Sequence, residues 1–97
     1  MERRRDDRIR RRIPVNYWQP GEKNYRHRGF TTDVSVSGMF IATAHPISSG
    51  RRVRVEIGAD DRGFLVEGQV THSFKTDPLV PDPQRAGMGV RFVPIKQ

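Results

Sequence analysis

The feature that most restricts the fold of this chain is the alternation of apolar and polar side chains with a period of two residues. Val53, Val55 and Ile57 alternate with the charged residues at positions 52, 54 and 56. The segment 87–92 repeats the pattern with Met88 and Val90 on its apolar side. A period of two is the geometry of a β-strand that buries one face. The chain is therefore predicted to be built from strands.

Six segments of the chain have this strand character, and turns or loops separate them. The expected strands begin at residues 13, 25, 38, 52, 64 and 87 and extend to about residues 17, 34, 43, 57, 72 and 92. Pro20 and Gly21 mark a turn, and Gly68 marks a bend or bulge within the long fifth strand. We find no convincing amphipathic helix and expect little or no C-terminal helix. Six short antiparallel strands predict an all-β fold, a small six-stranded β-barrel, because closure removes the exposed edges.

Size and composition restrict the class of protein. The 97 residues are enough for one domain with a lean core, because 34% of them are hydrophobic and 30% are charged. The absence of cysteine excludes disulfides and thiolate metal sites. No apolar run approaches the roughly 20 residues that a membrane-spanning helix needs. The arginine-rich start has no apolar segment behind it, so it is not a secretory signal, and we expect a soluble cytoplasmic protein.

The net charge of +7 is concentrated at the amino terminus. Residues 1–12 hold seven arginines against three carboxylates, and only Ile9 among them is a candidate anchor to an apolar core. We therefore expect a flexible basic arm over residues 1–12, followed by a barrel domain over residues 13–97. Such an arm attracts polyanions of any kind, so charge alone does not choose between a dinucleotide, a nucleic acid and an anionic membrane.

A second polar motif lies about twenty residues after the arm, where residues 33–38 have the sequence DVSVSG. Arginine forks suit phosphate oxygens and the O6/N7 edge of guanine. A carboxylate close to a hydroxyl and a glycine suits the donor edge of the same base. The two stretches together predict a site for a guanine nucleotide that carries more than one phosphate.

The same residues carry a family resemblance. An RxxxR motif at Arg4 to Arg8, followed by DxSxxG at Asp33 to Gly38, resembles the signature of PilZ domains, which bind the bacterial second messenger cyclic di-GMP. The segments 12–15, 38–41 and 87–92 also resemble strands of that family, so the likeness covers nearly the whole chain and indicates a stand-alone, single-domain member. It implies a six-stranded barrel, no catalysis, and no cofactor besides the ligand.

The resemblance assigns a role to each motif residue. Arg4 and Arg8 would grip phosphates and contact guanines, and Asp33 would accept hydrogen bonds from a guanine N1–H and N2–H. Ser35 would contact a phosphate or base, although it is also a common turn residue. Gly38 would let the backbone approach a flat base or adopt a positive φ.

Three further residues are candidate accessory contacts: Arg3, Arg5 and His72. His72 stands where many family members carry a tryptophan over the bound base, and a half-exposed strand histidine is the plain alternative. Arg8 to Arg12 also fits RxxxR; we favour Arg4 and Arg8 because Arg12 then falls at the start of the first strand.

The sequence favours a receptor over an enzyme. The three histidines lack metal-ligand spacing, and no phosphate loop or nucleophile elbow is present. The expected partners are cyclic di-GMP and a downstream protein that responds to the rearranged arm, with no specific nucleic acid and no membrane insertion. Two alternatives remain open at this point: a small basic nucleic-acid-binding barrel, and a PilZ-like adaptor that does not bind the ligand.

Overall fold

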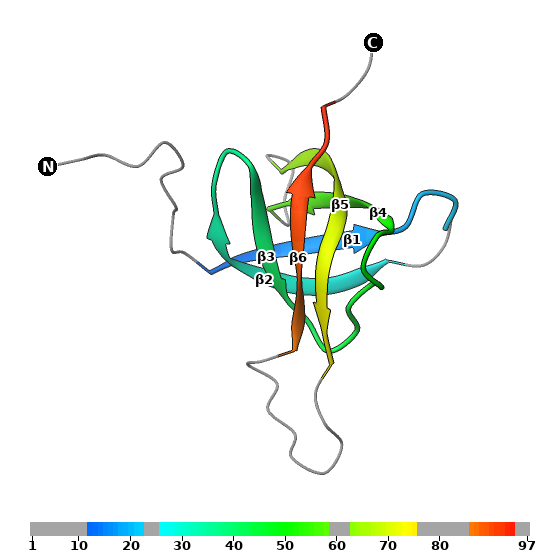
Figure 1. The fold of residues 1–97 in the computed structure, drawn as a ribbon. Coiled ribbons are helices and arrows are strands. Elements are labelled where there is room, and N and C mark those ends of the chain that lie inside the picture. The colour runs from blue at the N-terminus through cyan, green and yellow to red at the C-terminus, as the bar shows by residue number, and fades with distance from the viewer. Residues whose placement is uncertain (1–11, 23–25, 59–62, 76–85, 95–97) are drawn as a thin grey trace, which may run out of the picture.

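The computed structural model describes residues 12–22, 26–58, 63–75 and 86–94, and these residues form a closed barrel of antiparallel strands (Figure 1). The six strands are β1 (Ile13–Trp18), β2 (His27–Val34), β3 (Gly38–Ala42), β4 (Arg52–Ile57), β5 (Phe64–Phe74) and β6 (Gly87–Phe92). Their order around the barrel is β1-β2-β3-β6-β5-β4, with β4 pairing back onto β1. The described residues contain no helix, so the all-β prediction is confirmed. The predicted arm, apart from Arg12, lies outside the described residues.

The long strand β5 closes the barrel because it pairs with two neighbours in succession. Residues 64–69 pair with β4, and residues 68–74 pair with β6. Figure 1 shows β5 and β6 side by side, crossing in front of β1 and β2. Of the bend or bulge predicted at Gly68, the bulge is wrong, since Gly68 is in register with both Val53 and Phe92. A Cβ at Gly68 would lie 2.9 Å from the Arg91 carbonyl oxygen, so close packing of the backbone explains this glycine.

The core consists of the side chains that face the barrel interior. Among these residues are Val15, Tyr17, Met39, Ile41, Val53, Val55, Val70, Met88 and Val90. Tyr17 is fully buried, and its hydroxyl donates to the His45 carbonyl at 2.7 Å and lies 2.7 Å from the Thr43 hydroxyl. Burial raises the pKa of Tyr17, and the hydrogen bond to Thr43 opposes part of that shift.

The predicted turn at Pro20 and Gly21 is confirmed. Gly21 has a φ of +101°, a conformation that favours glycine, and the Glu22 amide donates to the Gln19 carbonyl at 3.0 Å. Within the described part of the chain, no helix has the length and apolarity needed to cross a membrane.

Candidate functional site

A bulge in β2 determines which way Asp33 faces. Thr31 pairs with Ile41 and Asp33 pairs with Phe40, so position 32 is an extra residue in β2. Side chains alternate between faces along a strand, so without the extra residue Asp33 would share the core-facing side with the fully buried Thr31. The bulge instead places Asp33 on the outer face beside Phe40 and returns Val34 to the core.

A second bulge, in β5, determines which way His72 faces. Val70 pairs with Val90 and His72 pairs with Gly89, so Thr71 is the extra residue. His72 therefore lies on the outer face, opposite a glycine that carries no side chain.

The two bulges align four residues in one row across four strands. Gly89 of β6 pairs with Phe40 of β3 on one side and with His72 of β5 on the other, while Phe40 pairs with Asp33 of β2. The row crosses a surface groove of about 610 Å³. The groove is lined by Asp33, Ser35, Ser37, Gly38, Met39, Phe40, Thr71, His72, Gly89, Val90 and Arg91. This volume is within the range typical of small-molecule sites.

Gly89 keeps the middle of this groove open. A Cβ at this position would lie 3.0 Å from Cδ2 of His72 and 3.1 Å from the Thr71 hydroxyl oxygen. The missing side chain therefore leaves a flat backbone floor between Phe40 and His72, which suits a planar ring.

Hydrogen bonds within the β2–β3 turn fix its shape. The Ser35 hydroxyl donates to the Gly38 carbonyl at 3.3 Å and accepts from the Ser37 amide at 3.3 Å, and the Ser35 amide donates to the Gly38 carbonyl at 2.9 Å. Ser35 is only 7% exposed, whereas Ser37 is exposed. A ligand contact from Ser35 would compete with these bonds. Ser37, to which sequence reasoning gave no role beyond the turn, is more accessible from the groove, and its hydroxyl lies 3.2 Å from that of Ser35.

Gly38 is explained by close packing against β6. Of the two alternatives predicted for Gly38, the positive φ is wrong, because the described glycines with positive φ are Gly21, Gly50 and Gly58, and approach to a flat base stays a prediction. A Cβ on Gly38 would overlap the Val90 carbonyl oxygen and lie 3.2 Å from the Cα of Arg91. The glycine of the motif thus lets β3 and β6 approach each other at the edge of the groove.

The structure therefore brings together four of the predicted site residues, Asp33, Ser35, Gly38 and His72. Arg3, Arg4, Arg5 and Arg8 lie outside the described residues. Sequence reasoning missed the other lining residues of β3, β5 and β6, because their proximity depends on register and on two bulges that no sequence signal marks. Among the described residues, no three His, Asp or Glu side chains are grouped as metal ligands.

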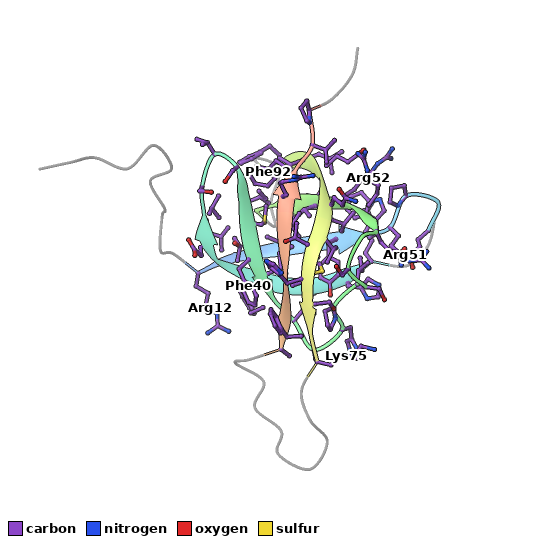
Figure 2. All side chains as sticks on the ribbon, viewed as in Figure 1. Arg12, Phe40, Arg51, Arg52, Lys75 and Phe92 are labelled. Carbon is purple, nitrogen blue, oxygen red and sulfur yellow. The ribbon has the colours of Figure 1, made fainter. Side chains whose placement is uncertain are left out.

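Arg12, the alternative second arginine of RxxxR, lies in a different groove. Its guanidinium carbon is 4.2 Å from the centroid of the Phe30 ring, in a cation–π contact. Figure 2 shows Arg12 at the start of β1. This second groove has a volume of about 480 Å³, and β1, β2, β3 and their flanking residues line it.

Comparison with known proteins gives the family of this chain. The family model for the PilZ domain matches residues 2–97. The chain belongs to the PilZ family. PilZ domains are a family of cyclic di-GMP receptors and are in general not catalytic.

Two solved structures similar to this PilZ chain show the same fold. One is the Bacillus subtilis inhibitor of motility MotI/DgrA, with a TM-score of 0.67 and 20% identity; the match covers 99% of this chain and 44% of that protein. The other is the PilZ domain of CeSA from a cellulose-synthesizing bacterium, with a TM-score of 0.65 and 16% identity, covering 92% and 83%. This chain thus spans less than half of MotI/DgrA. No curated protein matches it.

Proposed function

We propose that this PilZ protein is a cyclic di-GMP receptor that relays the messenger to a partner protein. The observation that carries the proposal is the row of Asp33, Phe40, Gly89 and His72 across the groove of the β2–β3 turn. A carboxylate at one end of a flat glycine floor, with aromatic rings beside it, offers the groups that a guanine needs: acceptors for its donor edge and surfaces for stacking.

Each side chain then has a distinct task. Asp33 accepts hydrogen bonds from N1–H and N2–H of one guanine. His72 and Phe40 flank the base above Gly89. The hydroxyls of Ser35 and Ser37 hold the turn in shape and contact polar atoms at the edge of the ligand.

Arg4 and Arg8 supply the arm that folds over the ligand. Ordering about six arm residues costs on the order of 6–12 kcal/mol. Each charge-assisted hydrogen bond contributes about 1.5–3 kcal/mol, so several arginine contacts are required before binding becomes favourable. A dissociation constant in the micromolar range is the expected net result. The contact of Arg12 supports Arg4 and Arg8, rather than Arg8 and Arg12, as the two arginines of RxxxR. The Arg12 guanidinium stacks on Phe30 in the neighbouring groove and not in the groove of Asp33.

The relay to a partner protein follows from the same folding of the arm over the ligand. Residues of the arm that close over the ligand change the surface beside the groove, and a downstream protein that contacts this surface detects the bound state.

Calorimetric titration with cyclic di-GMP tests the receptor function. We expect wild-type protein to bind, and both Arg8→Ala and Asp33→Ala to weaken binding at least tenfold. Cyclic di-AMP is the matched control ligand, because adenine lacks the N1–H and N2–H donors that Asp33 would recognise. Unchanged affinity in both variants would refute the assignment. A nucleic-acid-binding barrel would instead prefer polynucleotides and lose affinity steeply with salt.

A further inference from the structure

Arg91 of β6 is an arginine that neither motif contains, yet it lines the same groove as Asp33. It is exposed and pairs with Gly38 of β3 on one side and Gln69 of β5 on the other. Arg52 and Arg54 of β4 are held by Glu67 at 3.3 and 3.4 Å. Arg91, in contrast, forms no ion pair or cation–π contact among the residues that the structure describes.

The local backbone presents Arg91 beside the hydroxyls of the β2–β3 turn. The amide of Phe92, the next residue, donates to the Ser37 carbonyl at 2.9 Å, which ties the end of β6 to the turn. Gly38, directly opposite Arg91, contributes no side chain to the outer face. Arg91 and Ser37 therefore border the same end of the groove without an intervening side chain at position 38.

The spacing between Asp33 and Arg91 suits the two ends of a nucleotide. Asp33 is on β2 and Arg91 is on β6, two strands away, which is about 10 Å in the direction of the sheet hydrogen bonds. Arg91 also lies two residues along β6 from Gly89, which is in the row of Asp33, and this adds an offset of about 7 Å along the strand. With its donor edge at Asp33 and its ring above Gly89, as proposed above, a guanine would carry its sugar and phosphate along β6 toward Arg91. A guanidinium is well suited to a phosphate because its planar fork donates to two oxygens at once.

We propose that Arg91 binds a phosphate of the nucleotide whose base Asp33 holds, and that Ser37 completes this phosphate subsite. The inference rests on the proposed receptor function and adds a contact supplied by the barrel itself. Because Arg91 is on a strand, its contact requires no ordering of the arm. It therefore sets much of the affinity that remains when the arm arginines are removed.

Calorimetry with cyclic di-GMP on the full chain, at one ionic strength, tests the subsite. Arg91→Ala should weaken binding about tenfold, and Arg91→Lys should weaken it less, since an ammonium keeps the charge but not the fork. Arg54→Ala is the matched control, because it also removes one exposed arginine from an outer strand face. It should change affinity less than twofold. In the Arg4→Ala/Arg8→Ala background, adding Arg91→Ala should remove most of the remaining binding.

A second measurement separates a phosphate contact from a structural role. NMR titrations with GMP and with guanosine should show that wild-type protein and Arg54→Ala prefer GMP, and that Arg91→Ala loses most of this preference. If Asp33→Ala weakens binding while Arg91→Ala behaves like Arg54→Ala in both measurements, the Arg91 subsite is wrong and the receptor function stands. If wild-type protein does not bind cyclic di-GMP, both proposals fail.

Discussion

The outer surface of the barrel carries two neighbouring grooves of comparable size but different chemistry. The groove beside β1, about 480 Å³, is lined by an aromatic ring and by Arg12 and Arg28, and its described lining has no carboxylate. The groove of the β2–β3 turn, about 610 Å³, has a carboxylate, hydroxyls and a glycine floor. A hollow of suitable size therefore does not identify the ligand site. The proposed site is chosen instead by its acceptor groups, which match the donor edge of a guanine.

The difference between the grooves arises at one extra residue in β2. Phe30 lies before the bulge and Asp33 after it, and each pairs with an outward-facing residue of β3, Ala42 and Phe40 respectively. Both side chains therefore face outward although they are three positions apart. The bulge divides the outer face into two grooves, the β1 groove with its two arginines and the turn groove with its carboxylate.

The largest expected effect concerns the edge of the turn groove. Gly38→Ala should lower the free energy of unfolding by about 3 kcal/mol. The new Cβ would overlap the Val90 carbonyl oxygen, and the backbone there can move only a little to relieve the overlap. Urea denaturation measures this change. Gly21→Ala is the control: nothing lies within 4 Å of its Cβ, so only its φ of +101° opposes substitution, at about 1 kcal/mol. Equal losses in the two variants would contradict the role of close packing at Gly38.

Substitution of Gly89 should have a smaller effect, and it should affect ligand binding more than stability. Gly89→Ala should weaken cyclic di-GMP binding about tenfold, or about 1.4 kcal/mol, because a methyl group raises the groove floor. Its effect on stability should be small, since the nearest atoms belong to the exposed side chains of His72 and Thr71, which can move. Calorimetry and urea denaturation on the same sample measure the two quantities.

The β1 groove supplies the control for Gly89→Ala. Phe30→Ala removes the ring that Arg12 covers, and Phe30 is not a lining residue of the turn groove. Its affinity for cyclic di-GMP should change less than twofold. A larger loss of affinity in Phe30→Ala than in Gly89→Ala would place the ligand in the β1 groove and contradict the comparison.

The smallest effect lies beneath the β1 groove, where Tyr17 contacts Thr43 of the groove wall. Tyr17→Phe should cost about 1 kcal/mol of unfolding free energy at neutral pH, because hydrogen bonds to Thr43 and His45 are lost.

The same variant has a pH signature. Burial raises the pKa of Tyr17 in the folded state above its ordinary value of 10.0, so the unfolded chain loses this proton first as pH rises. The contribution of Tyr17 to stability is complete below about pH 10 and declines as pH rises through the folded pKa. Wild-type protein should therefore lose stability above pH 10 more steeply than Tyr17→Phe, as measured by denaturation at a series of pH values. Parallel curves would contradict this prediction.

Much of the barrel was predictable because its signals are local. The alternation at Val53, Val55 and Ile57 follows from one buried face, and the Pro20-Gly21 turn requires a positive φ that glycine adopts readily. Gly68 shows the limit of such reasoning. In the sequence, a glycine within a strand looks the same whether it forms a bulge or makes room for a neighbouring backbone. The structure places the bulge of β5 at Thr71 instead.

The candidate site was predictable only in part. The DxSxxG motif named Asp33, Ser35 and Gly38 because its residues are close in sequence. Phe40, Gly89 and Arg91 could not be added, since they join the groove through the pairing of β3, β5 and β6.

The sequence alone determined an all-β chain with a basic amino terminus and an acid-hydroxyl-glycine turn, because residue type and local spacing specify them. The tertiary structure decided which side chains share a surface. Closure of the barrel sets the register between strands distant in sequence, and two extra residues reverse the alternation after them. Only then do a carboxylate, a glycine floor, a histidine and an arginine lie along one groove.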